Sequence, residues 1–162
     1  MTAKDIQRAI IRERYARNTT LPNYTPRNWF ECDVFEVTAA GYFVEYEVKL
    51  SKSDFRADAE KAKRNYDQDW NASLERKHDL LAVSDARGPS RFYFVTPENL
   101  IDEQELPPWA GLIVAYYDGG RKVYLHTRRP APQLHRIKLE DARFQSAMTT
   151  CYWRFLRLYL RT

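Results

Sequence analysis

Apolar and polar residues alternate strictly in one segment of the chain. Between residues 42 and 50, the even-numbered positions are Tyr, Val, Tyr, Val and Leu. The odd-numbered positions after Phe43 are Glu45, Glu47 and Lys49. Side chains of a strand point alternately to its two faces. The pattern therefore predicts a strand that packs one face and carries charge on the other.

A second apolar segment, residues 29 to 37, precedes this strand, and the turn residues Thr38 to Gly41 separate the two. Together they predict a β-hairpin. If residues whose numbers sum to 80 pair across the hairpin, Asp33 lies opposite Glu47 on the charged face. Opposed side chains have Cβ atoms about 4.5 to 5.5 Å apart, so two such carboxylates can share one divalent cation. The charged face is thus either a solvated surface or a catalytic site.

Helices are predicted on both sides of the hairpin. Residues 3 to 17 place apolar side chains at helical spacing, whereas residues 19 to 26 contain two prolines and indicate an extended connection. After the hairpin, Ser51 or Ser53 caps a helix that continues, with a break, to Lys77.

The second half of the chain predicts strands and a final helix. Short apolar segments indicate strands at residues 80 to 84, 91 to 96, 111 to 117 and 122 to 127. A helix rich in basic and aromatic residues follows at about 140 to 161. This order of elements predicts a single α/β domain over residues 1 to 162, with a mixed β-sheet flanked by helices.

Composition narrows the class of protein. A mean hydropathy of −0.67 and the lack of an apolar run of about twenty residues argue against membrane spans. The first residues alternate charged and apolar types, unlike a secretory signal, so we expect a cytoplasmic protein. Cys32 and Cys151 form no CxxC pair, and the histidines lack the close spacing of metal ligands. We expect two reduced thiols.

Positive charge is concentrated near the C-terminal end. The net charge is +4, and between Arg121 and Arg161 the acidic residues are Glu140 and Asp141 alone. Aromatic residues are interleaved with the basic ones there, a mixture that suits phosphate contact and base stacking. A solvated surface beside a buried aromatic stripe explains the same pattern equally well.

The predicted first helix adds a third carboxylate to the hairpin pair. At about 100° per residue, Glu13 falls on the same side as the apolar residues Ile6 and Ile10. Carboxylates are the hard oxygen ligands that Mg²⁺ prefers. A bound metal polarises a phosphodiester and lowers the pKa of water, while a lysine such as Lys49 orients that water or neutralises developing charge.

The order Glu13, Asp33 and Glu47-Val48-Lys49 resembles the PD-(D/E)xK nuclease superfamily. In that superfamily a helix carboxylate, a strand aspartate and a following ExK strand build the metal site. Over about residues 5 to 127, the chain is similar to small Holliday-junction-resolvase-like nucleases and to MmcB-like repair endonucleases. The segments that carry this second similarity are KLSKSDFRAD, the KH pair at Lys77 and His78, FYFVTPENLI and LPPWAGLIVAYY.

The resemblance implies a restriction-endonuclease-like fold and a DNA endonuclease that uses Mg²⁺ or Mn²⁺. Asp33, Glu47 and Glu13 would hold the metal, Lys49 would assist the attacking water, and a homodimer is expected. The acid-x-Lys motif is weak alone, since Glu75-Arg76-Lys77 repeats it in a polar stretch. Secondary candidates for contact with nucleic acid are Arg56, Lys63, Lys77, Arg154 and Arg157.

Two departures from the superfamily keep an alternative open. Cys32, not proline, precedes Asp33, and residues 19 to 28 make a poor version of the strand that often precedes the aspartate strand. The alternative is a non-catalytic nucleic-acid-binding or assembly module on the same fold. Retention of all the expected site residues favours the enzyme.

Overall fold

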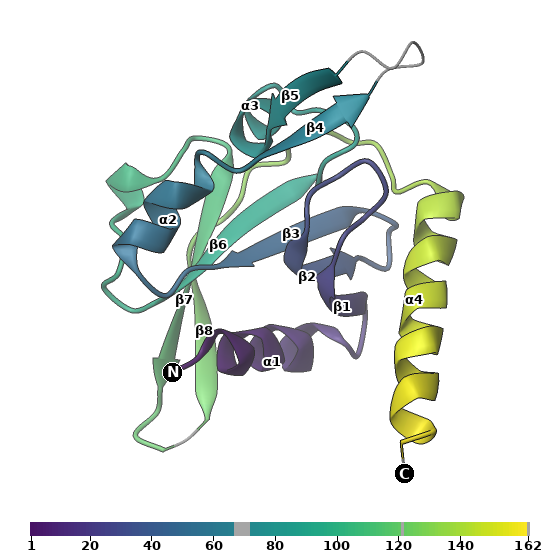
Figure 1. The fold of residues 1–162 in the computed structure, drawn as a ribbon. Helices are drawn as coiled ribbons and strands as arrows, with labels where there is room; N and C mark the ends of the chain where they lie inside the picture. Colours follow the sequence, from purple (N-terminus) through teal and green to yellow (C-terminus); the bar gives the residue numbers. More distant parts are fainter. Residues whose placement is uncertain (67–71, 121, 162) are drawn as a thin grey trace.

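A mixed β-sheet forms the centre of the protein in the computed structural model, which describes residues 1–66, 72–120 and 122–161 (Figure 1). Within the described residues, this sheet has six strands in the order β1-β2-β3-β6-β7-β8. Their bounds are Thr19–Tyr24, Cys32–Val37, Phe43–Val48, Arg91–Pro97, Ala110–Tyr117 and Val123–Arg129. Strand β6 pairs in parallel with β3 and β7, and the remaining pairs are antiparallel. The predicted α/β class with a mixed sheet is confirmed.

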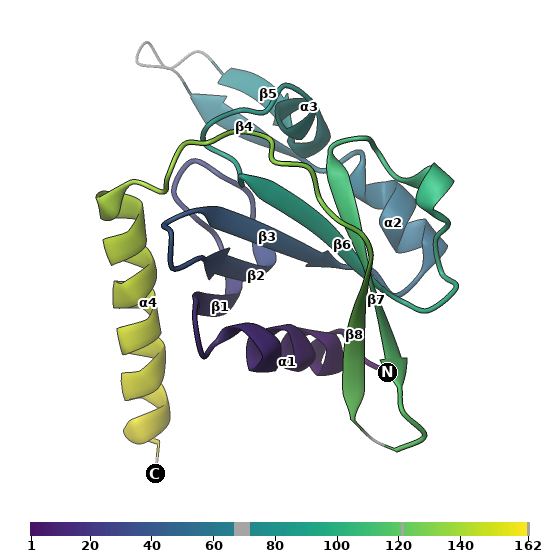
Figure 2. The ribbon, with the colours of Figure 1, turned by 180° about the vertical axis from the view of Figure 1, so that it is seen from behind.

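Helix α1 (Ala3–Arg14) covers one face of the sheet, and the remaining elements lie around the other face and its edge (Figure 2). These are helix α2 (Lys52–Asp58), the hairpin of β4 (Ala62–Tyr66) and β5 (Ala72–Arg76), helix α3 (Lys77–Ala82), a 3₁₀ turn at Glu103–Glu105 and helix α4 (Asp141–Tyr159). None of the described helices has the length and apolar composition needed to cross a bilayer.

Two apolar clusters hold these layers together. Ile6 and Ile10 of α1 pack against Val44, Tyr46 and Val48 of β3, which are the even-numbered residues of the strand. The opposite cluster is rich in aromatic side chains and includes Trp29, Phe35, Phe43, Phe92 and Phe94. Both faces of β3 are therefore covered, and its charged residues lie beneath the elements on the second face.

The predicted hairpin register is confirmed. Val34 pairs with Tyr46, and Val37 pairs with Phe43, so the numbers of paired residues sum to 80. A slip of one residue would move every side chain of a strand to the other face. The even-numbered apolar residues of β3 prevent this slip because α1 buries them.

Three of the predicted elements are wrong. Residues 19 to 24 form strand β1, because Pro22 lies in an edge strand, where the sheet tolerates proline. The predicted helix ends at Asp58, and the chain continues into the β4–β5 hairpin; its residues 67 to 71 lie outside the described part. The predicted strand at 80 to 84 belongs largely to α3, since a short apolar run suits a buried helix as well as a strand.

The predicted C-terminal helix is confirmed as α4, which stands beside strand β1 at the sheet edge (Figure 1). Its first half is anchored by Ala147, which is fully buried. In its second half, large apolar side chains face solvent: Tyr152, Trp153, Phe155, Leu158, Tyr159 and Leu160. Of the two alternatives for this segment, the one with a buried aromatic stripe does not hold, because the stripe is largely exposed.

Candidate functional site

The hairpin register brings Asp33 and Glu47 to one cleft. The Oδ2 atom of Asp33 accepts a hydrogen bond of 2.7 Å from the backbone N–H of Val48, which lies between Glu47 and Lys49. All four residues line an open cleft of about 540 Å³. The structure therefore gathers three of the predicted site side chains, those of Asp33, Glu47 and Lys49, at one end of the hairpin.

Asp33 and Glu47 interact electrostatically across this cleft. Burial and the negative charge of Glu47 raise the pKa of Asp33, against the opposing effects of the Val48 N–H and Lys49. Two ionised carboxylates close together repel each other, and a cation between them relieves this repulsion. The pair therefore favours positive charge in the cleft.

Three lysine ammonium groups surround Glu47. Lys49 and Lys61 lie 3.0 and 3.1 Å from Oε1, and Lys77 lies 2.7 Å from Oε2. Burial acts to raise the pKa of Glu47, but Lys77 and the other two lysines outweigh it, so the pKa is lowered. Glu47 is thus an ionised, buried carboxylate. Because the Lys61 side chain is 34% exposed, it is the lysine best placed to move away.

Lys49 is held by a second carboxylate as well. Its Nζ atom lies 2.7 Å from Oδ1 of Asp58, whose other oxygen lies 2.8 Å from Nε2 of His78. Burial acts to lower the pKa of Lys49, but Glu47 and Asp58 outweigh it and raise the pKa. The side chain is therefore a stable ammonium ion that donates hydrogen bonds.

Lys77 and Glu45 form a buried ion pair behind the cleft. Both side chains are fully buried, with 2.5 Å between Nζ and Oε1, and Trp29 donates a hydrogen bond to the other oxygen of Glu45. The expected contact of Lys77 with nucleic acid is wrong, because the β4–β5 hairpin and α3 cover this part of the sheet. The same elements bury Glu45 on the charged face of β3.

Glu13 does not join the cleft. It is exposed, and it lies near the end of α1, ten residues from Ala3, which lines the cleft. Ten residues of helix span about 15 Å, which is too far for a shared site. Gln7 of α1 donates a hydrogen bond to the carbonyl oxygen of Asp33 instead. The expected role of Glu13 is wrong because helical periodicity specifies a face, not a position along it.

The other candidates for contact with nucleic acid lie outside the cleft lining. Arg56 and Arg157 are exposed, and Arg154 donates hydrogen bonds to the carbonyl oxygens of Pro22 and Asn23, so it fastens α4 to the sheet edge. The ammonium group of Lys63 lies 3.3 Å from the carbonyl oxygen of Trp29. The cleft itself is lined by five carboxylate residues and two lysines: Asp33, Glu47, Asp54, Asp58, Glu60, Lys49 and Lys61.

Sequence patterns missed the contacts of Lys61 and Lys77 with Glu47. For Asp58 the sequence left open a contact with Lys49 or Lys61 and an ordinary ion pair within its helix, and the structure shows the contact with Lys49. Ser51 caps α2 by accepting a hydrogen bond from Asp54 N–H, and this cap was the sequence signal for the helix. Asp58 is the last residue of that helix and contacts Lys49. Lys61 and Lys77 flank the β4–β5 hairpin and are joined by a backbone hydrogen bond from Lys77 N–H to the Lys61 carbonyl oxygen. The contact of both lysines with Glu47 could be predicted only from the β4–β5 hairpin, and the sequence pattern predicted a helix there.

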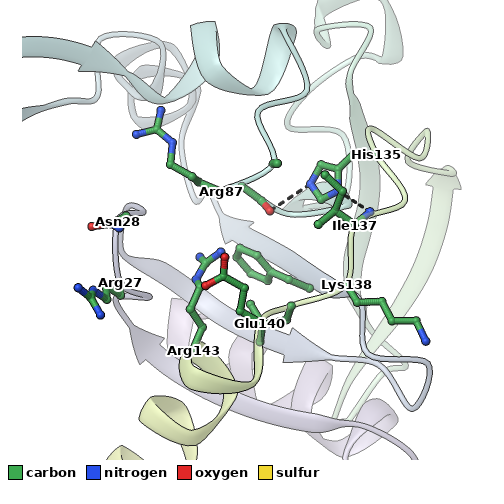
Figure 3. A pocket seen from close by; sticks show the side chains of 12 residues that line it. Arg27, Asn28, Arg87, His135, Ile137, Lys138, Glu140 and Arg143 are labelled. Atoms are coloured by element: carbon green, nitrogen blue, oxygen red, sulfur yellow. Dashed lines mark hydrogen bonds between the residues drawn. The ribbon is translucent and has the colours of Figure 1, made fainter. Parts of the chain in front are cut away.

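A separate, partly open pocket of about 150 Å³ lies beside the start of α4 (Figure 3). Glu140 and Arg143 point toward one another in its centre, whereas Arg27 and Lys138 extend away from it. His135 fastens the lining segment by a contact of 3.2 Å between its Nε2 and the carbonyl oxygen of Gly88. Among the described residues, four cationic residues line the pocket against one carboxylate, Glu140. Arg87 among them already pairs with Glu75 and Asp85.

Within the described residues, no cluster of three or more His, Cys, Asp or Glu side chains has the arrangement of a metal site. The side chains of the predicted site that could ligate a metal ion in the cleft are therefore a pair of carboxylates, Asp33 and Glu47. Mg²⁺ is usually bound by one or two carboxylates together with water and substrate phosphates. A pair of carboxylates matches this kind of binding.

Comparison with known proteins shows the fold. A solved structure, the SPO1766 protein of unknown function from Silicibacter pomeroyi, is similar with a TM-score of 0.62 and 21% sequence identity. The match covers 97% of this chain and 88% of that chain. No known family profile matches the sequence, and no curated protein matches it. The neighbour supports the α/β architecture.

Proposed function

We propose that the protein is a divalent-metal-dependent DNA endonuclease that hydrolyses phosphodiester bonds at the Asp33–Glu47–Lys49 cleft. The observation that carries this proposal is the hairpin register, which brings both carboxylates and Lys49 to one cleft. The resemblance to the PD-(D/E)xK superfamily supports the choice of DNA. A homodimer, as among the junction-cutting relatives, remains a prediction.

Asp33 and Glu47 would hold Mg²⁺ or Mn²⁺, which would polarise the scissile phosphate and activate water. The raised pKa of Asp33 supports this assignment, because burial and then the repulsion from Glu47 raise it, and a bound cation relieves that repulsion. The cleft lining also contains five carboxylates against two lysines. A DNA phosphate approaching this lining meets net negative charge, so we expect productive DNA binding to depend on metal.

Lys49 would act on the attacking water or on the phosphate. Its raised pKa keeps the ammonium charged, so it donates a hydrogen bond rather than accepting a proton. Lys77 has a different role, because its fully buried ammonium group lies 2.7 Å from Oε2 of Glu47 and fixes that carboxylate. Lys61, on the exposed side, pairs with Oε1 and would leave when the cleft takes up a cation.

The proposal is tested by incubating the protein with supercoiled, linear, single-stranded and branched DNA, in Mg²⁺, in Mn²⁺ or in EDTA. We expect cleavage of at least one substrate that requires the metal and is lost in Glu47→Gln and Lys49→Met proteins. Glu13→Gln is the matched control, because it removes an exposed carboxylate outside the cleft. Cleavage that persists in the Glu47→Gln protein contradicts the mechanism.

One observation favours a second candidate, a non-catalytic nucleic-acid-binding module. Both oxygens of Glu47 already pair with lysines, so its charge is compensated without a metal. This candidate predicts DNA binding that is unchanged by EDTA and by Glu47→Gln, with no cleavage of any substrate. Gel-shift titrations beside the cleavage assay therefore separate the two functions.

A further inference from the structure

A buried carboxylate and a histidine support the Lys49 ammonium group in addition to Glu47. Asp58 Oδ1 lies 2.7 Å from Lys49 Nζ, and Asp58 Oδ2 lies 2.8 Å from His78 Nε2. The Asp58 side chain is 1% exposed. Lys49, Asp58 and His78 thus form a continuous chain from the cleft to His78, whose side chain is 16% exposed.

The histidine end of this chain is fixed by packing. The His78 ring lies edge-on to Trp109, with 4.8 Å between ring centroids, and it also contacts Phe94 at 6.1 Å. Trp109 and Phe94 are buried core residues. The ring therefore has little freedom to turn, and through its hydrogen bond it holds the Asp58 carboxylate in one orientation.

Asp58 occupies a position that is unfavourable for a carboxylate. It is the last residue of α2, where the helix end carries partial negative charge, and it is buried. A buried carboxylate loses hydration, and the loss is offset only by well-placed partners. The partners here are Lys49 and His78. The buried Asp58 carboxylate is therefore stabilised only if Lys49 and His78 keep their positions.

Glu47 alone does not position Lys49. Its Oε1 atom is shared between Lys49 and Lys61, so any cation that binds Glu47 changes this contact. Asp58 contacts Lys49 at a shorter distance than Glu47 does, and it has no second cleft lysine within salt-bridge distance among the described residues. The contact with Asp58 therefore does not depend on an oxygen atom that Lys49 shares with another lysine.

We infer that Asp58 and His78 are positioning residues, which together hold the Lys49 ammonium group at the cleft while Glu47 binds a metal ion. His78 orients Asp58, and Asp58 orients Lys49. The inference rests on the proposed function for its catalytic meaning, since Lys49 would then act on water or phosphate. The contacts among Lys49, Asp58 and His78 can be tested without DNA or metal.

The test uses NMR of lysine ammonium groups in the full chain, without DNA. In the wild-type protein we expect a resolved, slowly exchanging Lys49 ammonium signal. In Asp58→Asn, hydrogen exchange at this group becomes at least about tenfold faster, because a charge-assisted hydrogen bond is lost. Asp54→Asn is the matched control: Asp54 lies on the same helix, 3.7 Å from the same nitrogen, and is 51% exposed. It should leave exchange unchanged.

A second variant covers the case in which Asp58→Asn fails to fold. His78→Phe keeps an aromatic ring against Trp109 but removes the nitrogen that bonds Asp58, so we expect the Lys49 signal to shift and to exchange faster. An unchanged Lys49 signal in His78→Phe or in folded Asp58→Asn overturns the inference. So does a wild-type protein whose Lys49 exchanges as fast as the exposed Lys52.

Cleavage kinetics then separate this inference from the proposed function. If the wild-type protein cuts DNA, we expect His78→Phe to lower kcat while KM for DNA changes by less than about twofold. If the wild-type protein cleaves no DNA, the nuclease proposal is rejected, and the NMR result alone decides whether Asp58 and His78 position Lys49. Normal cleavage with an unchanged Lys49 signal in the variants rejects the positioning alone.

Discussion

The Asp33 carboxylate accepts a 2.7 Å hydrogen bond from the backbone N–H of Val48, the residue between Glu47 and Lys49. This contact joins the start of β2 to the end of β3, just beyond the last ladder pair of the hairpin. It fixes Asp33 beside the acid-x-Lys segment through the backbone. The proposed site thus depends on hairpin geometry and not on flexible side chains alone.

Asp33→Asn should stabilise the metal-free protein and abolish its response to metal. An asparagine oxygen still accepts the Val48 hydrogen bond, while the repulsion from Glu47 that raises the pKa of Asp33 disappears. In the wild-type protein, Mn²⁺ at about 100 times Kd should add about 2.7 kcal/mol to the free energy of unfolding. Urea unfolding with Mn²⁺ or EDTA measures both effects. A response to Mn²⁺ in Asp33→Asn equal to that of the wild type would show that the ion binds elsewhere.

Lys77→Met should be strongly destabilising. Lys77 pairs with Glu45 and Glu47, and its removal leaves two buried carboxylates without their shared cation. Breaking a buried ion pair in this way costs about 3 to 5 kcal/mol. Lys52→Met is the control, since Lys52 forms a surface pair with Glu105, for which about 0 to 1 kcal/mol is expected. Equal stability of the two variants, measured by urea unfolding, would contradict the buried network.

Asp58 should contribute to the loss of stability in acid. Burial acts to raise its pKa, but the His78 hydrogen bond and the charges of Lys77 and Lys49 outweigh it and hold the pKa well below its usual 3.8. The folded protein therefore binds fewer protons here than the unfolded chain. This stabilisation is complete above the unfolded pKa and is lost as the pH falls toward the folded one.

The corresponding measurement is urea unfolding of wild-type and Asp58→Asn proteins between about pH 7 and pH 3, where acid-linked loss of stability develops. The wild-type protein should lose more stability than the variant as the pH falls below about 4. The Asp54→Asn variant, which removes a half-exposed carboxylate, should lose stability with falling pH as the wild type does. Parallel curves for wild type and Asp58→Asn would show that Asp58 is not held ionised.

The hairpin could be predicted from the sequence because its signal is local. Strict alternation from Tyr42 to Leu50 specified the faces of β3, and the short turn specified the register that brings Asp33 to Glu47. The burial of Glu45 was not predictable in the same way. Alternation gives the face on which a side chain lies, but burial depends on the elements that later cover that face.

The remainder of the site depends on contacts between distant segments. Lys61 and Lys77 reach Glu47 through the β4–β5 hairpin, whose sequence resembled a helix because its apolar residues also fit helical spacing. Tertiary pairing overrides such weak local preferences. The predicted role of Glu13 in the site was wrong for a different reason. Its helix was predicted correctly, but the position of that helix along the sheet is a tertiary property.

Single-turnover cleavage of a branched DNA, with enzyme in excess, tests the central claim most directly. The wild-type protein should cut this DNA in Mg²⁺ and not in EDTA, and Asp33→Asn and Glu47→Gln should each slow cleavage by at least about 100-fold. Glu13→Gln should cut at the wild-type rate. Cleavage by Asp33→Asn or Glu47→Gln at the wild-type rate, or no cleavage by the wild-type protein, would contradict the assignment of the cleft as a nuclease site.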